Sequence, residues 1–314
     1  MSSTLTVNFS LRQNKAIERS IAFDALRMVA TELNGDPVYV GLGSVWFQDF
    51  RLAHRLLGVE KMISIERDAD VFARAEFNRP FASIEMVEGP TEDVLPVLLD
   101  RDDLMGRPWI VWLDYDQQID EDRLEELSRL IVALPDRSAL LTTFNARDNA
   151  YAHDASRRFD ALRELFGEDI VADDLQEPTL KGPVFMRALA QCVLDHLSAR
   201  AVQSGRPGGF VPGIRLLYHD SVNMITVGGF LPGTSAASSC QGMVRSDGWC
   251  GFEDALIKTQ PLTIREVQAL CRLLPSDTGL VQKARESLGF NLSDTQLDFF
   301  SRHYLRYPTY AEIL

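Results

Sequence analysis

Two acidic residues flank a tyrosine directly after the most apolar segment of the sequence. Asp114 and Asp116 surround Tyr115 at the end of the run PWIVWLDYD. If this strand stays extended to its end, both carboxylates lie on one face and the tyrosine on the other. Two carboxylates so close repel each other unless a metal ion, a cationic group or a shared proton compensates them. A structural helix cap needs only one acid, and Asp120 fits that role better, so Asp114 and Asp116 are the candidate catalytic residues.

Two segments nearer the N-terminus could hold a nucleotide-like ligand. Gly41 and Gly43 stand one residue apart after an apolar run, and glycines at a strand end let backbone amides approach a ligand. Glu66 ends the next apolar run, about 23 residues after Gly43, and an acid at that place accepts hydrogen bonds from ribose hydroxyls. The alternatives are a plain tight turn and a solvated glutamate, but the two features together favour a ligand site.

These residues belong to a regular alternation of expected strands and helices. The apolar runs that predict strands cover residues 38–42, 61–68, 83–89, 108–116 and 138–145. Segments with helical spacing of apolar residues cover 16–33, 50–58, 70–78 and 120–134. This alternation indicates a parallel sheet covered by helices on both faces. Ligands of such sheets bind at the carboxyl ends of the strands, where the candidate residues are expected.

After residue 150 the alternation loosens. A helix-rich insertion is expected over about 151–204. Two further strands are expected within 214–230, joined at Asp220 and Ser221, and this hairpin would add antiparallel strands to the sheet edge. We therefore expect one α/β domain over residues 1–231.

The C-terminal part of the sequence contains two helix-start signals. Thr263 with Glu266, and Ser293 with Gln296, have the spacing of capping boxes. Apolar residues flank each pair in the positions that a hydrophobic staple uses. These signals predict a folded C-terminal helical module over residues 232–314.

The basic residues near the N-terminus are expected to form a solvated helix face. Arg12, Lys15 and Arg19 have helical spacing, and Glu18 interrupts them, so this interpretation is favoured over a phosphate-binding arm. The five histidines have no spacing typical of zinc ligands. His219 precedes the expected hairpin turn, where a surface or capping role is favoured over that of a general base.

The composition favours a globular cytoplasmic protein. The net charge is −13, so no overall field attracts nucleic acid or an anionic membrane, although a local basic patch stays open. No apolar stretch has the length of a membrane span, and the N-terminus is too polar for a signal peptide. The four cysteines lack CxxC spacing, which favours reduced, packed cysteines over disulfides or structural zinc. The composition gives no indication of the oligomeric state.

Four segments, taken in order, resemble the motifs of class I S-adenosylmethionine-dependent methyltransferases. They are VYVGLGS, ISIERD, VEGPTEDVLP and WIVWLDYD. More narrowly, the sequence is similar to an uncharacterised bacterial group described as O-methyltransferases, over roughly residues 15–145. The resemblance implies a Rossmann-like methyltransferase sheet with parallel strands and an antiparallel hairpin edge, together with the helical insertion and the C-terminal helical module.

The resemblance also implies which residues bind the cofactor S-adenosylmethionine, all of them near the ends of the expected strands. In chain order they are Gly41, Gly43 and Ser44 for the methionine and ribose, Glu66 for the ribose hydroxyls, Arg67, Pro90 and Thr91 for the adenine, and Asp114 for the methyl-donor end.

The sequence departs from the family pattern at several positions. Tyr39 stands where the first motif usually has an acid that bonds the cofactor's amino group, and Val45 replaces the third glycine. LDYDQ is similar to the Asp-x-Asp of metal-dependent O-methyltransferases, but only Asn145 matches their Asp-Asn pair after the fifth strand. A Mg²⁺ site built from Asp114 and Asn145 would therefore be incomplete.

The sequence thus favours methyl transfer from S-adenosylmethionine to an oxygen acceptor. The enzyme would align the acceptor with the methyl group, and Asp114 or Asp116 would act as base or metal ligand. A small-molecule acceptor is favoured, because the fourth strand lacks the Pro-Pro aromatic signature of enzymes that methylate amino groups in nucleic acids; a nucleic-acid acceptor stays open. The alternatives are a non-catalytic binding or regulatory protein, supported by Tyr39 and Val45, and a less favoured NAD-dependent oxidoreductase.

Overall fold

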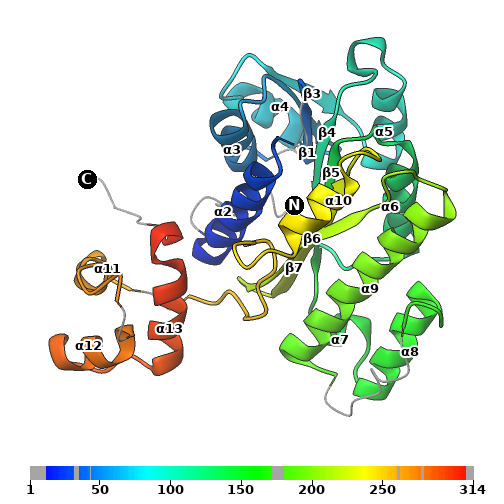
Figure 1. The fold of residues 1–314 in the computed structure, drawn as a ribbon. Coiled ribbons are helices and arrows are strands. Elements are labelled where there is room, and N and C mark those ends of the chain that lie inside the picture. Colours follow the sequence, from blue (N-terminus) through cyan, green and yellow to red (C-terminus); the bar gives the residue numbers. More distant parts are fainter. Residues whose placement is uncertain are drawn as a thin grey trace.

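In the part of the chain that the structure describes, a seven-stranded β-sheet forms the centre (Figure 1). The computed structural model describes residues 12–31, 35–42, 44–171, 180–259, 262–276 and 279–308. The strands are β1 (Val38–Leu42), β2 (Lys61–Glu66), β3 (Ile84–Glu88), β4 (Trp109–Asp114), β5 (Ser138–Asn145), β6 (Val211–His219) and β7 (Asn223–Leu231). Their order is β3-β2-β1-β4-β5-β7-β6. β1 to β5 are parallel and β7 is antiparallel to β5 and β6, which confirms the predicted Rossmann-like sheet with a hairpin edge.

The central strands are apolar because both of their faces are covered. In β4 the residues from Trp109 to Leu113 are all buried, as expected for a parallel strand between two helical layers. At the antiparallel edge, Gly228 lets β7 approach β5, since a Cβ atom there would lie 2.3 Å from the carbonyl oxygen of Leu140. Close pairing at this edge therefore depends on the missing side chain.

Helices cover both faces of the sheet (Figure 1). They are α2 (Gln13–Met28), α3 (Gln48–Leu57), α4 (Ala69–Asn78), α5 (Thr91–Leu99), α6 (Glu121–Ala133), α7 (Asp148–Tyr151), α8 (Ala155–Phe166), α9 (Gly182–Gln203), α10 (Ala237–Val244), α11 (Ile264–Cys271), α12 (Leu280–Ser287) and α13 (Asp294–His303). One hydrophobic core joins the sheet to α6, α8 and α9, and a second joins it to α2, α3 and α10. α5 is not among the helices expected from the sequence; it begins directly after Pro90.

The helices α11, α12 and α13 lie beside α2, away from the sheet (Figure 1). Both predicted capping boxes are confirmed. The Thr263 hydroxyl accepts from the backbone N–H of Glu266, whose carboxylate accepts from the N–H of Thr263 at 2.6 Å. Ser293 and Gln296 form the same reciprocal pair.

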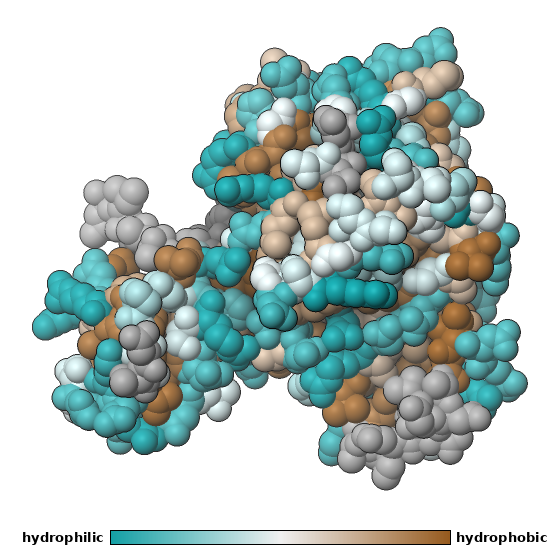
Figure 2. Space-filling view, viewed as in Figure 1, coloured by the Kyte–Doolittle hydropathy of each residue, from teal (hydrophilic) through white to brown (hydrophobic). Residues whose placement is uncertain are grey.

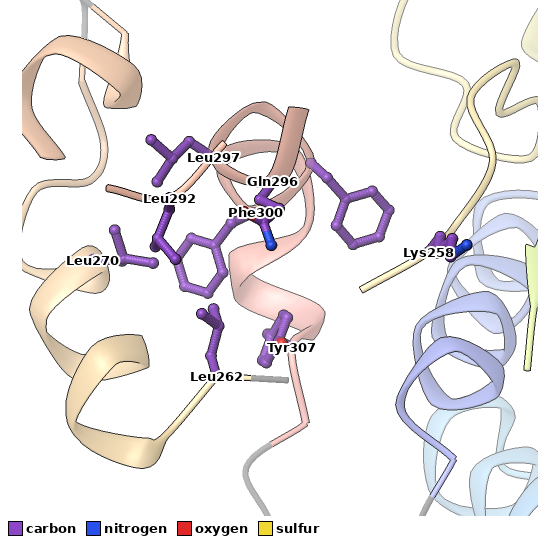
Figure 3. A pocket seen from close by; sticks show the side chains of 9 residues that line it. Lys258, Leu262, Leu270, Leu292, Gln296, Leu297, Phe300 and Tyr307 are labelled. Carbon is purple, nitrogen blue, oxygen red and sulfur yellow. The ribbon is translucent and has the colours of Figure 1, made fainter. Parts of the chain in front are cut away.

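Leucine side chains and Phe300 point toward one another inside this helical module (Figure 3). The side chains are those of Leu262, Leu270, Leu292 and Leu297. The space that they leave is about 10 Å³, which is roughly the room that one water molecule needs. This gap is therefore an imperfection of the module's core and not a ligand site.

The segment before the module packs on the sheet edge. Phe252 and Ile257 form isolated bridges with β6, and the Trp249 indole donates to the carbonyl oxygen of Gly213 at 2.8 Å. The boundary between domain and module stays a prediction, and we propose on these contacts that it lies after Ile257 and not at residue 232.

Among the described residues, none of the helices is both long enough and apolar enough to cross a membrane. The face seen in Figure 2 is mostly hydrophilic or intermediate in hydropathy, with hydrophobic residues in separate groups. The cysteines Cys192, Cys240, Cys250 and Cys271 are all free. A cytoplasmic location stays a prediction.

Replacing Thr263 by alanine tests the stability of the C-terminal module. We expect Thr263→Ala to lower the free energy of unfolding by about 0.5–2 kcal/mol, because it removes the acceptor that caps α11. Urea-induced unfolding measures this change. Ser287→Ala at the exposed end of α12 is the matched control and should leave stability nearly unchanged. Amide exchange at unfolded-state rates throughout 262–276 and 279–308 would contradict a folded module.

Candidate active site

The carboxyl ends of the parallel strands, helix α2 and the β6–β7 turn enclose a large cavity. Its volume is about 690 Å³, within the range of small-molecule sites, roughly 300–1,000 Å³. The structure brings these predicted residues together along it: Ser44, Glu66, Arg67, Pro90, Thr91, Asp114 and Asp116. Gly41 is buried and is not among the lining residues, and Gly43 lies outside the described residues.

Lys15 of α2 is buried against Asp114 at the end of β4. Its ammonium nitrogen lies 3.0 Å from both carboxylate oxygens of Asp114. It also lies 3.3 Å from the Tyr218 hydroxyl and 3.3 Å from the Glu18 carboxylate. The ammonium group therefore donates hydrogen bonds to Asp114 and Tyr218 and forms an ion pair with Glu18. Lys15 is 4% exposed, whereas the Asp114 side chain is 40% exposed, so Asp114 is the member of the pair that opens to the cavity.

Two aromatic rings and a second carboxylate surround the same ammonium group. The nitrogen of Lys15 lies 5.2 Å from the ring centre of Trp112 and 5.1 Å from that of Tyr218, within the range of cation–π attraction. Glu18 is completely buried; burial raises the pKa of its carboxyl group and the charge of Lys15 opposes that rise. Removing Lys15 would therefore leave Glu18 as a buried acid without its closest cation.

The prediction of a solvated N-terminal helix face is wrong. Lys15, Glu18 and Arg19 are all buried, and Lys15 and Arg19 line the cavity together with Arg12. Their spacing fits a solvated face equally well, because the sequence does not show that this helix crosses the carboxyl edge of the sheet. The signal that was available is the i, i+3 pair of Lys15 and Glu18 beside the apolar residues Ile17 and Ile21.

The two candidate acids do not both belong to the strand. β4 ends at Asp114, and Asp116 follows in a bend, although both line the cavity. The sequence left open whether a metal ion, a cationic group or a shared proton compensates the two carboxylates. The structure shows a cationic group, Lys15, beside Asp114. His219 is bonded to Asn223 across the hairpin at 2.7 Å and is not among the cavity residues, in line with a structural role.

An acid, Asp49, lies beside Tyr39. The Tyr39 hydroxyl donates to the carboxylate of Asp49 at 2.7 Å, and Asp49, in the first turn of α3, lines the cavity. Burial raises the pKa of Asp49, while the charge of Arg19 and the Tyr39 bond lower it. A Cβ atom at Gly41 would lie 3.1 Å from the Tyr39 ring, so this glycine makes room for the pair. Val45 packs into the core and does not occupy the cavity.

Glu66 ends β2 with its carboxylate at the cavity wall. Its Oε1 accepts from the backbone N–H of Asp68 at 3.0 Å, which fixes the side chain. Partial burial raises the pKa of Glu66, and the backbone bonds from Asp68 and Arg67 oppose the rise. A carboxylate held in this way has lone pairs left for the two hydroxyls of a ribose.

Arg123 of α6 supports the cavity wall beside Pro90 and Thr91. Arg123 donates to Thr91 at 3.2 Å and to Glu126 at 2.9 Å. Its guanidinium lies 4.9 Å from the ring centre of Tyr115, whose hydroxyl donates to Glu126 at 2.5 Å. Arg123 is not among the site residues expected from the sequence, since its place in the first turn of a helix predicts nothing beyond that helix.

The predicted pair of Asp114 and Asn145 does not fit a Mg²⁺ ion. Asp114 is bonded to Lys15, and Oδ1 of Asn145 accepts from the backbone N–H of Arg147 at 3.0 Å. Within the described ranges there is no group of three histidine, cysteine or acidic side chains able to hold a metal.

The donors and acceptors along the cavity fit S-adenosylmethionine. Glu66 offers acceptors for ribose hydroxyls, and Asp49 and Arg19 offer opposite charges for an amino-acid group. Thr91, Pro90 and Tyr115 offer a polar and aromatic wall for a base. The sheet order, with antiparallel β7 between β5 and β6, together with this cavity defines a class I S-adenosylmethionine-dependent methyltransferase.

The family model described as "Putative O-methyltransferase" matches residues 7–314, and the chain belongs to this family. A search of curated proteins found no match to the sequence.

Solved structures of methyltransferases are similar to this chain in fold. One is Trm1 from Pyrococcus horikoshii with S-adenosylmethionine, at 14% identity and a TM-score of 0.46, covering 72% of this chain and 57% of that one. Another is the O-methyltransferase TomG from Streptomyces achromogenes, at 14% identity and a TM-score of 0.37, covering 74% of this chain and 94% of that one. A third is human N-acetylserotonin methyltransferase, at 15% identity and a TM-score of 0.34, covering 73% of this chain and 61% of that one. This chain thus spans little more than half of the Trm1 chain.

Replacing Glu66 tests the ribose contact. We expect Glu66→Ala to weaken binding of S-adenosylhomocysteine by on the order of 1–3 kcal/mol, because the ribose hydroxyls lose their acceptor. Calorimetric titration measures the affinity. Glu88→Ala, at the exposed end of the neighbouring strand β3, is the matched control and should bind as the parent does. Equal affinities of both variants would remove Glu66 from the site.

Replacing Lys15 tests its buried ion pair with Glu18. We expect Lys15→Met to lower the free energy of unfolding by about 3–5 kcal/mol at neutral pH, because Glu18 is left as a buried charge. The raised pKa of Glu18 means that the folded state binds its proton more tightly than the unfolded state. The loss should therefore shrink as the pH falls and Glu18 becomes neutral.

The double variant Lys15→Met/Glu18→Gln is the control for this charge effect. It should recover part of the stability at neutral pH and show less dependence on pH, both measured by urea unfolding. A single variant that is equally destabilised at every pH, with no recovery in the double variant, would mean that packing and not charge is responsible.

Proposed function

We propose that this methyltransferase transfers the methyl group of S-adenosylmethionine to an oxygen atom of a small-molecule acceptor. The observation that carries the proposal is the position of Asp114 at the carboxyl end of β4, open to the cavity while Lys15 contacts both of its oxygens. A carboxylate fixed in this way can accept a hydrogen bond or a proton from an acceptor hydroxyl.

S-adenosylmethionine, when bound, supplies an electrophilic methyl group. The residues of the chain have three tasks. Glu66 and the wall at Pro90 and Thr91 hold the nucleoside part, Lys15 keeps the Asp114 carboxylate in one orientation, and Asp114 orients the acceptor hydroxyl and receives its proton. Alignment of the two reactants accounts for much of the acceleration in such a reaction. Asp116, farther along the same rim, is the second candidate for the base.

The charge of the cavity supports a small molecule over a nucleic acid as the acceptor. Acidic residues outnumber basic ones along the wall, and most of the basic ones are paired with acids. The chain as a whole carries a net charge of −13. A polyanion would meet repulsion at such a surface.

The two alternatives have less support. The non-catalytic alternative was based on Tyr39 and Val45, but Asp49 provides an acid beside Tyr39 and Val45 packs into the core. The NAD-dependent alternative is not supported, because the dinucleotide fold has the strand order 3-2-1-4-5-6 and this sheet has antiparallel β7 inserted beside β5.

Replacing Asp114 by asparagine tests its part in the chemistry. We expect Asp114→Asn to abolish methyl transfer while S-adenosylhomocysteine binds within roughly tenfold of the parent, as for a group that acts mainly in the transition state. Transfer of a labelled methyl group to a panel of phenols, carboxylates, nucleosides and RNA gives the activity, and calorimetry gives the affinity.

Asp116→Asn is the matched control, and it should retain more activity than Asp114→Asn. Turnover of the Asp114 variant at the parent rate would contradict the assignment. If the parent methylates none of the panel while binding S-adenosylhomocysteine, the non-catalytic alternative gains support.

A further inference from the structure

The cavity extends from the end of β3 to the β6–β7 turn, and the residues proposed for the nucleoside line only one side of it. Glu66 and Thr91 follow β2 and β3, which lie at one side of the sheet, whereas β7 and β6 lie at the other. Met224 at the start of β7 pairs with Asn145 at the end of β5, so the β6–β7 turn reaches the same edge. The part of the cavity between Asp114 and this turn, called the acceptor half below, is therefore the room for the methyl acceptor.

One wall of the acceptor half is the loop after β4, which carries three polar side chains in succession. Asp116, Gln117 and Gln118 all line the cavity and are exposed. In the part of the chain that the structure describes, the side-chain amides of Gln117 and Gln118 form no hydrogen bond. Each amide offers two N–H donors and one acceptor oxygen. This wall can thus both donate to and accept from one ligand.

The backbone of this loop is held by two neighbouring elements. The N–H of Asn145 at the end of β5 donates to the carbonyl oxygen of Gln117 at 2.9 Å. The Tyr151 hydroxyl of α7 accepts from the N–H of Ile119 at 3.2 Å and donates to the carbonyl oxygen of Asn145 at 3.1 Å. A site on a supported backbone binds its ligand more precisely than one on a loose loop. The amides therefore extend from fixed positions on the cavity wall.

A second wall of the acceptor half comes from the β6–β7 turn and the start of α2. Asp220 and Ser221 line the cavity, and the guanidinium of Arg12 lies 3.5 Å from the Asp220 carboxylate. The side chain of Asp220 is 7% exposed and that of Arg12 is 28% exposed. A guanidinium beside a carboxylate presents donors and acceptors next to each other, an arrangement that fits neighbouring hydroxyl groups.

The charges of the acceptor half favour an uncharged ligand. Arg12 and Lys15, the basic residues at the start of α2, already have carboxylates beside them, those of Asp220 and Asp114. An anionic acceptor would have to compete with these carboxylates, whereas a neutral molecule can contact the same groups without separating an ion pair. A flat aromatic acceptor would cover the amides of Gln117 and Gln118 without giving them partners, which is unfavourable.

We infer that the methyl acceptor is an uncharged polyhydroxylated compound, a sugar or cyclic polyol, bound by the amides of Gln117 and Gln118. Further hydroxyls contact the Arg12–Asp220 pair. The inference rests on the proposed function, since the oxygen that receives the methyl group is one hydroxyl of this compound.

The chemistry of such an acceptor matches the position of Asp114. An aliphatic hydroxyl keeps its proton at neutral pH, so its methylation depends on a base held beside it. The hydroxyl oxygen forms a bond to the methyl carbon while the carbon–sulfur bond of the donor breaks. The proton passes to Asp114, and S-adenosylhomocysteine leaves.

A panel of acceptors tests the inference on the complete protein. The polyols are glucose, mannose, myo-inositol and sorbitol, and the aromatic comparison compounds are catechol and 4-hydroxybenzoate. Saturation-transfer NMR in the presence of S-adenosylhomocysteine detects binding, and transfer of a labelled methyl group detects turnover. We expect at least one polyol to bind and to be methylated with a kcat/KM at least about tenfold above that of either aromatic compound.

A double variant assigns the contacts. Gln117→Ala/Gln118→Ala should weaken polyol binding at least about tenfold, because several hydrogen bonds are lost, and leave the affinity for S-adenosylhomocysteine within about twofold. Both side chains are exposed, so the substitutions leave the core intact. Gln241→Ala, at an exposed position of α10 outside the cavity, is the matched control and should bind both ligands as the parent does.

The outcomes separate this inference from the proposed function. If the parent methylates an aromatic hydroxyl and no polyol, the inference is wrong and the proposed function stands. Equal polyol binding by the double variant and the control also overturns the inference, as does the absence of binding and transfer for every polyol. A polyol that binds through the two glutamines without receiving a methyl group supports the polyol site and contradicts the proposed transfer.

Discussion

The ion pair between the buried Lys15 and Asp114 at the cavity edge is the constraint on which the rest of the site depends. It joins the first described helix to the end of the central strand β4, and Glu18 and Tyr218 complete the surroundings of the ammonium group. A cation taken out of water is tolerated only when its partners are close and well oriented. These contacts therefore hold helix α2 across the carboxyl edge of the sheet.

This position of α2 connects the cavity with the two ends of the fold. Asn14 accepts from the backbone N–H of Thr259 at 2.7 Å, so the start of the helix is tied to the segment that leads into the C-terminal module. Farther along, Asp24 pairs with Arg306 at 2.7 Å, close to the end of the module. The helical module thus supports the helix that carries the cavity's basic residues, although the gap of about 10 Å³ between its leucines and Phe300 is too small for a ligand.

Local patterns predicted the strands and helix starts well, because these depend on neighbouring residues. The carboxylate at the end of β2 and the capping box at Thr263 are examples, since each follows from spacing along a few residues. The roles of Lys15 and Asp49 could not be predicted in the same way. Lys15 meets Tyr218 across 203 residues of sequence, and Asp49 becomes a cavity residue only because α3 turns back beside Tyr39.

The contact between α2 and β6 has a consequence for the order in which the protein is completed on the ribosome. Lys15 is synthesised 203 residues before Tyr218, a delay of roughly 10–40 s at about 5–20 residues per second. During that time the charged side chains of α2 remain in water, because β6, which forms part of the cavity wall, has not yet been synthesised. Contacts between such distant segments form late and slowly. The cavity is therefore among the last parts of the nascent chain to close, after the parallel strands beneath it have been made.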